Sequence, residues 1–199
     1  MRLAAPSAIG VREHSGWAAL VAVAGDVAAP TVIDRRRISL LLPGMPGEAY
    51  HAVVGMPIER ARERVREVLE GARECAAREI ASVVAALESD GYRVSALGCG
   101  VSPSPVRVPL ERVLKAHPLL HASEGDLFRD AVAEAAEGLG LAVSRAPWKE
   151  LWAQAGAELG GLDARELVAI MGAGLGPPWG ADQKEACAAA VLALALDRR

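Results

Sequence analysis

Two carboxylates stand three residues apart near the carboxyl end of the sequence, at Asp182 and Glu185. The residues after them are small or apolar at helical spacing, which predicts a terminal helix within 177–199 that can lie close against a sheet. Residues three apart share one helix face. The pair could cap and solubilise the first turn, where the helix dipole favours negative charge, or hold a divalent metal such as Mg²⁺ or Mn²⁺.

Histidines supply a second group of candidates. His117, His121 and Glu124 follow one another at spacings that suit a helical metal site, and sets of two histidines and a carboxylate bind Zn²⁺, Mn²⁺ or Fe²⁺. Pro118 argues against a continuous helix there. The alternative is that His121, like His14 near the first predicted strand, is a hydrogen-bonded structural residue and that Glu124 supports a helix terminus.

The hydrophobic pattern predicts one mixed α/β domain over residues 1–199. Short turns join the first three strands, so these strands must pair antiparallel. After a long amphipathic helix, a fourth strand is expected to return parallel to the first. The predicted strands are 8–11, 17–24, 31–42, 92–98 and 141–144, and the main predicted helices are 58–89, 121–140, 147–159, 164–171 and the last segment.

Two polar segments have both a structural and a functional interpretation. The run from Asp34 to Arg37 can be an edge strand protected by charge, or a contact for an anion. Tyr50 and His51 lie in a Pro- and Gly-rich connection, where they can pack a loop or contact a ligand. The sequence alone leaves both choices open.

Composition limits the classes of function. The net charge of −3 does not favour broad, non-specific binding of nucleic acid, although a local basic patch would allow it. The three cysteines are widely spaced, form no zinc or disulfide pattern, and fit the reducing cytoplasm, where we expect the protein to be. No apolar run has membrane-spanning length, so we expect no membrane association.

The order of elements, three antiparallel strands followed by βα units, resembles the ribonuclease H-like fold with a mixed five-stranded sheet. The end of the chain resembles RuvC-type Holliday-junction resolvases, whose last helix carries Asp-x-x-Asp before Ala-rich residues. Asp182 and Glu185 occupy that pattern, and Lys149 matches the lysine after the fifth strand. The segment 8–11 and the turn at 15–16 are similar to the first strand and turn of that family.

The chain departs from this family at two acidic positions. The position of the first-strand aspartate falls at Arg12, and the acidic residue at the end of the fourth strand falls near Gly98 and Cys99. Cleavage of a phosphodiester with two Mg²⁺ ions needs several carboxylates to place the metals. The resemblance therefore implies a degenerate or non-standard metal site. An actin-like ATPase of the same fold is not expected, because no Gly-rich phosphate loop follows the first strand.

In this fold the ends of the first and fourth strands and the start of the last helix converge, which implies a replacement site. The expected cation ligands are Glu13, Glu124, Asp182 and Glu185. The residues expected to act in catalysis are Glu13, His14, His121 and Glu124. The two histidines would ligate the metal or move protons. The first hypothesis is a nuclease-like protein that binds nucleic acid and, if active, is a metal-dependent phosphodiester hydrolase. The alternative is a non-catalytic interaction or scaffold protein, expected as a homodimer.

Overall fold

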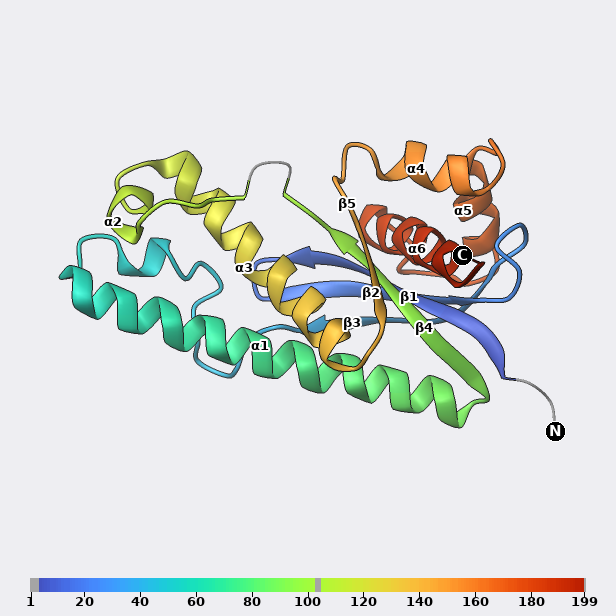
Figure 1. Cartoon of the computed structure of the whole chain (residues 1–199), viewed down its shortest axis with the longest axis horizontal. Helices are drawn as coiled ribbons and strands as arrows, with labels where there is room; N and C mark the ends of the chain where they lie inside the picture. The colour runs from blue at the N-terminus through green and yellow to red at the C-terminus, as the bar shows by residue number, and fades with distance from the viewer. Residues whose placement is uncertain (1–3, 103–104, 199) are drawn as a thin grey trace.

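The computed structural model describes residues 4–102 and 105–198, so residues 103 and 104 of the predicted loop after the fourth strand lie outside the described part. Its centre is a five-stranded sheet in the order β3-β2-β1-β4-β5 (Figure 1). The strands are β1 (Ala5–His14), β2 (Trp17–Ala24), β3 (Thr31–Ser39), β4 (Tyr92–Gly100) and β5 (Ala142–Ala146). The first three pair antiparallel, and β4 lies parallel to both β1 and β5. The predicted mixed sheet is confirmed.

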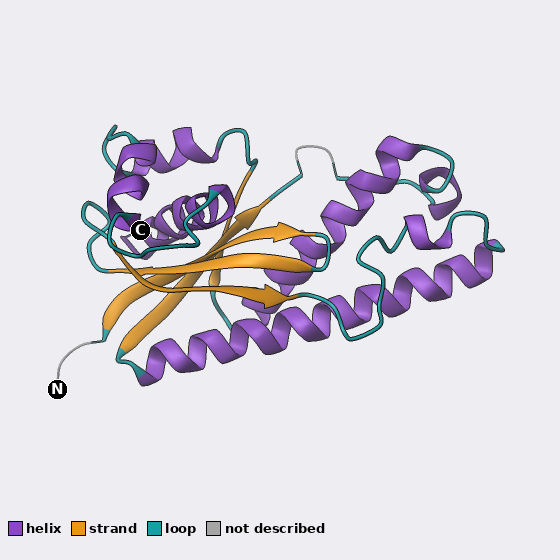
Figure 2. Cartoon of the chain, turned by 180° about the vertical axis from the view of Figure 1, so that it is seen from behind, coloured by secondary structure: helices purple, strands orange, loops and turns teal. Residues whose placement is uncertain are grey.

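Helices cover both faces of this sheet (Figures 1 and 2). One face carries α1 (Ile58–Ser89) and α3 (His117–Gly138), which pack on each other and enclose the larger core cluster. The other face carries α4 (Leu151–Glu158), α5 (Ala164–Gly172) and α6 (Ala181–Leu194). The short helices are η1 (His51–Val53), α2 (Leu110–Val113) and η2 (Ala195–Arg198). None of the helices described is both long and apolar enough to cross a membrane.

The last helix lies unusually close to the sheet. A Cβ atom at Gly10 of β1 would stand 1.8 Å from the carbonyl oxygen of Ala186, and one at Gly98 of β4 would stand 2.1 Å from that of Ala189. Only glycine in the strands and alanine on the helix allow this approach. The close packing predicted from the small residues of α6 is confirmed, and it brings the start of α6 against the carboxyl end of β1.

The third helix begins earlier than the sequence predicts. The pattern places its start at His121 with Ser123 as a cap, but α3 starts at His117. Pro118 lies in the first turn, where no backbone N–H is needed for the helix, so it opens the helix instead of breaking it. Ser123 is buried within the helix, and its hydroxyl has no hydrogen-bond partner among the described residues. In contrast, Asp163 caps α5 as predicted, accepting the backbone N–H groups of Arg165 and Glu166.

Candidate functional site

The carboxylates of α6 meet two cationic or basic side chains of β1. The Nε of Arg12 donates to Glu185 at 2.5 Å, and the Nε2 of His14 lies 2.8 Å from the carboxylate of Asp182. Residues 12 and 14 share the face of β1 that is turned to α6, because side chains alternate along a strand. We call these four residues the β1–α6 cluster.

Aromatic rings extend the β1–α6 cluster on both sides. The guanidinium of Arg12 lies 4.4 Å from the ring centre of Trp148, and His14 stacks on Trp17 with ring centres 4.3 Å apart. The guanidinium of Arg37 also lies over the Trp17 ring, 3.8 Å from its centre. Trp17 and the exposed Arg37 also line an open hollow of about 380 Å³. An exposed cation that rests on an aromatic ring is therefore presented beside the β1–α6 cluster.

The residues of the β1–α6 cluster do not fit the metal pair that the resemblance implies. Glu185 is already neutralised by Arg12, which stands at the family's aspartate position. Gly98 supplies no ligand, and a side chain there would collide with the backbone of α6. Two Mg²⁺ ions need several converging carboxylates. Here the strands contribute a guanidinium and an imidazole instead, so no metal-dependent step is assigned to this cluster.

Glu13 lies on the opposite face of β1 from this cluster. It is 5% exposed, and one of its carboxyl oxygens accepts the backbone N–H of Gly100 at 3.1 Å. The other oxygen is buried and has no hydrogen-bond partner in the part of the chain described. Burial raises the pKa of Glu13 to about 7, against the opposing effects of backbone N–H groups and of the charges of Arg129 and Arg12. The sheet separates Glu13 from the carboxylates of α6, so Glu13 cannot share a metal with them.

A second polar group, the histidine cluster, joins η1 to the first two turns of α3. It consists of His51, His117, His121 and Glu124. Glu124 is 3% exposed and accepts the backbone N–H of His51 at 3.2 Å. The same carboxylate lies 2.8 Å from Nδ1 of His51 and 3.9 Å from Nδ1 of His121. One ring nitrogen of each histidine lies within 4.8 Å of the other two, which is a geometry that could hold a metal ion.

The structure therefore divides the residues that the sequence expects in one site. His14 meets Asp182, and His121 meets Glu124, but Glu124 is not brought to Asp182 and Glu185. The physical reason is that α3 and α6 pack on opposite faces of the sheet. Over residues 4–102 and 105–198, the histidines of the histidine cluster are the one set of three side chains with metal-ligand spacing.

Two partners in these clusters were not found as site residues from the sequence. The sequence treats His51 as a separate loop residue, and it treats Arg12 only as a lost ligand. Each meets its partners through tertiary packing between segments far apart in the chain, which periodicity within a helix or strand does not report. The signal available for His51 was its position in a Pro- and Gly-rich connection, where ligand contacts are common.

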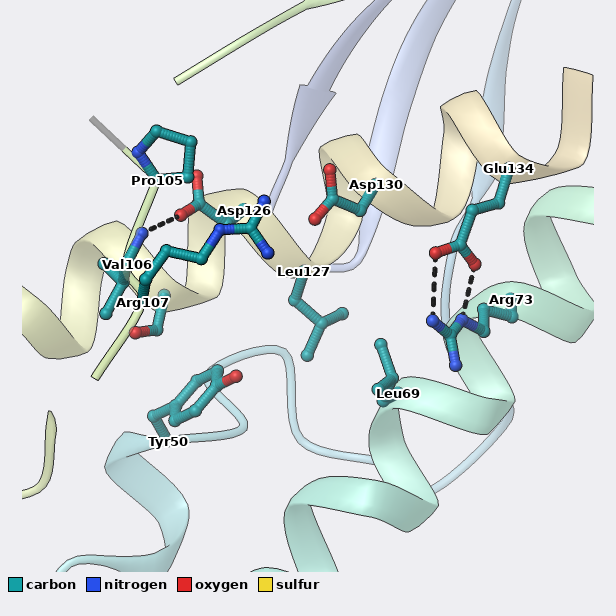
Figure 3. A pocket seen from close by; sticks show the side chains of 11 residues that line it. Tyr50, Leu69, Arg73, Pro105, Val106, Arg107, Asp126, Leu127, Asp130 and Glu134 are labelled. Atoms are coloured by element: carbon teal, nitrogen blue, oxygen red, sulfur yellow. Dashed lines mark hydrogen bonds and ion pairs between the residues drawn. The ribbon is translucent and has the colours of Figure 1, made fainter. Parts of the chain in front are cut away.

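A small hollow of about 180 Å³ lies between α1 and α3 (Figure 3). Its acidic wall comes from α3, and most of these acids already have partners. Glu134 is bound by Arg73 at 2.6 and 2.9 Å, and Asp126 accepts the backbone N–H of Val106 at 3.0 Å. Burial raises the pKa of Tyr50, which closes the floor of the hollow, and nearby acids add to this rise. Its paired acids and small volume favour a structural role.

Comparison with known proteins gives relatives in structure but not in sequence. No family model matches the chain, and no curated protein matches it significantly. The structure of Thermus thermophilus RuvC in complex with a Holliday junction substrate is similar, with a TM-score of 0.55, 14% identity, and coverage of 96% of this chain and 94% of that one. A second T. thermophilus RuvC structure is similar with a TM-score of 0.54 and 14% identity, and the match covers 96% of this chain and 95% of that one. The resemblance stated from the sequence is confirmed at the level of the fold: this chain has the ribonuclease H-like fold of the RuvC structures.

Proposed function

We propose that this chain is a RuvC-like protein that binds nucleic acid and does not cleave it by the two-metal route. The observation that carries this proposal is the ion pair between Arg12 and Glu185. It places a fixed positive charge where a metal-dependent nuclease of this fold needs a carboxylate. Binding of nucleic acid is supported by the RuvC structure solved with a Holliday junction, whose fold is similar over nearly the whole of this chain.

The local surface supports binding through stacking and charge. Arg37 rests on the indole of Trp17 and presents its exposed guanidinium next to an open hollow, near the end of β1 where the β1–α6 cluster lies. A guanidinium can stack on bases and contact phosphates. Lys149, next to Trp148, is also exposed at this end of the molecule. Because the net charge is −3, binding is expected to be local and strongly weakened by salt.

The run from Asp34 to Arg37 has two roles on this surface. Its strand, β3, is an edge of the sheet, as the structural interpretation predicts. Arg35 is used inside the molecule, donating to carbonyl oxygens of the connection 175–178. Arg36 pairs with Asp34 at 2.6 Å. Arg37 is the arginine of this run that stands over an aromatic ring, so it is the residue to test for an anion contact.

The test is the affinity for labelled four-way junction, duplex and single-stranded DNA, measured by fluorescence anisotropy at low salt. Replacing Arg37 with Ala should weaken binding by about tenfold, since one stacked and charged contact is worth about 1–3 kcal/mol. Arg64→Ala is the matched control, because Arg64 is an exposed arginine of α1 that pairs with Glu67 at 2.5 Å. Equal losses in the two variants would reject Arg37 as a contact.

The alternative function, a non-catalytic interaction or scaffold protein, predicts a different outcome. Wild-type protein would then show no binding to any of the three DNA forms, even at low salt. The homodimer and the cytoplasmic location expected from the sequence stay predictions, which size-exclusion chromatography with light scattering and cell fractionation would test.

A further inference from the structure

We propose that His51, His117 and His121 form a site for a transition metal of the zinc class, with Glu124 orienting the ligands. This site lies outside the β1–α6 cluster and does not depend on nucleic-acid binding. Its three imidazoles come from η1 and from the first two turns of α3, with ring centres 4.5 to 5.5 Å apart.

The spacing of the ring nitrogens suits one metal ion after a small movement. Zinc bonds to histidine nitrogens at about 2.0 Å, so tetrahedral ligands lie about 3.3 Å from one another. The nitrogens here lie within 4.8 Å of one another, so closing the site requires rotations that bring them up to about 1.5 Å nearer. His117 and His121 are exposed and therefore free to make this adjustment. They are also four residues apart on one helix, the spacing by which helices present two histidines to zinc.

Glu124 is the carboxylate that would orient the histidines for metal binding, which three neighbouring histidines alone would lack. Metal-binding histidines usually donate their second ring N–H to a carboxylate, which fixes the ring and leaves the other nitrogen to the metal. The buried carboxylate of Glu124 lies 2.8 Å from Nδ1 of His51 and also accepts the backbone N–H of the same residue. It lies on the Nδ1 side of His121 as well, at 3.9 Å. In this arrangement Nε2 of His51 is the metal ligand.

The donor set decides which ions fit. Three imidazoles favour Zn²⁺, Co²⁺, Ni²⁺ or Cu²⁺ over Mg²⁺, which prefers oxygen ligands. Three protein ligands also leave a fourth position for water or for another ligand. His51 lines an open hollow of about 600 Å³ with Ser15, Glu48 and their neighbours, so an exogenous ligand has space to approach.

The experiment uses the full chain without an affinity tag, treated with chelator and then titrated with ZnCl₂ or MgCl₂ by calorimetry. We expect one Zn²⁺ to bind per chain with micromolar or tighter affinity, and Zn²⁺ but not Mg²⁺ to raise the melting temperature by mass action. His121→Ala should weaken Zn²⁺ binding at least tenfold. Glu124→Gln should weaken it about tenfold to a hundredfold with the stoichiometry unchanged.

The fourth histidine provides the control, since the chain has four in all. His14 lies in the β1–α6 cluster, so His14→Ala should keep the Zn²⁺ affinity of the wild type. Circular dichroism of each metal-free variant separates loss of a ligand from loss of the fold. Zn²⁺ affinity that is only millimolar, or equal in wild type and His121→Ala, would overturn the proposal, as would loss of binding in His14→Ala alone. None of these results depends on whether the chain binds DNA.

Discussion

Arg12 and His14 project from the same face of β1, and each meets one carboxylate of α6. Pairs with this much exposure contribute at most about 1 kcal/mol to folding, so stability alone does not explain them. Their main effect is on charge. A cation entering between Asp182 and Glu185 would have to displace a guanidinium that also rests on Trp148. In the function that we propose, these ion pairs take the place of the metal pair.

The buried carboxyl of Glu13 predicts a dependence of stability on pH. Its pKa is raised from 4.5 to about 7 in the folded state, so between these values the folded chain keeps a proton that the unfolded chain has lost. The need to ionise the buried Glu13 therefore destabilises the folded chain. This destabilisation is absent well below pH 4.5, grows as the pH rises from 4.5 to 7, and is constant above pH 7.

Glu13→Gln removes this titration and keeps the shape of the side chain. One pKa unit corresponds to about 1.4 kcal/mol, so the variant should gain about 3 kcal/mol relative to wild type between pH 4.5 and pH 8. Urea unfolding of both proteins at pH 4.5, 6 and 8 measures this difference. A difference that stays constant across the series would show that Glu13 titrates alike in the folded and unfolded chains.

At the scale of the elements, the fold depends on the contact between α6 and the two central strands. Gly10 and Gly98 let the helix backbone approach β1 and β4, and the approach sets the start of α6 against the end of β1. The sequence predicted this contact from the small residues of α6. It could not predict which strand residues would face the carboxylates, because a shift of one residue turns every side chain of a strand to the other face.

Gly98→Ala should disrupt this contact. The new Cβ would stand 2.1 Å from a carbonyl oxygen of α6, so the helix must move, at a cost of about 1–3 kcal/mol. Gly138→Ala is the control, because Gly138 is the last residue of α3 and a Cβ there meets nothing within 4 Å. That change should be neutral or stabilise the protein by up to about 1 kcal/mol. Thermal unfolding of both variants gives the comparison, and equal melting temperatures would contradict the packing argument.

The elements themselves show what the sequence can and cannot predict. The 32-residue helix α1 begins and ends where the apolar stripe predicts, since a long amphipathic pattern is a strong signal. The start of α3 was predicted at His121, after Pro118, because proline is ambiguous between breaking a helix and opening one. That error hid the fact that His117 and His121 share a continuous helix with Glu124, and so it weakened the evidence for a site there.

On the scale of the whole molecule, the two faces of the sheet carry different chemistry. The face that α6 covers (Figure 1) holds ion pairs and half-buried aromatic rings at the end of β1. The face that α1 and α3 cover leads to the histidine cluster. The sequence predicted most residues of both groups but merged them into one site, and it did not identify Arg12 or His51 as site residues. Which side of a sheet a helix covers is decided by the crossover connections and the packing of the entire chain, not by any local pattern.

Binding of nucleic acid without metal-dependent cleavage is tested with a labelled four-way junction incubated with the protein and either Mg²⁺ or Mn²⁺. Each sample is run on a native gel and on a denaturing gel. We expect a retarded complex on the native gel and intact strands on the denaturing gel with either ion. Cleaved strands that require the metal would contradict it, because the cluster of Arg12, His14, Asp182 and Glu185 would then support the chemistry denied to it here. Intact strands without a retarded complex would contradict the binding half and favour a protein partner.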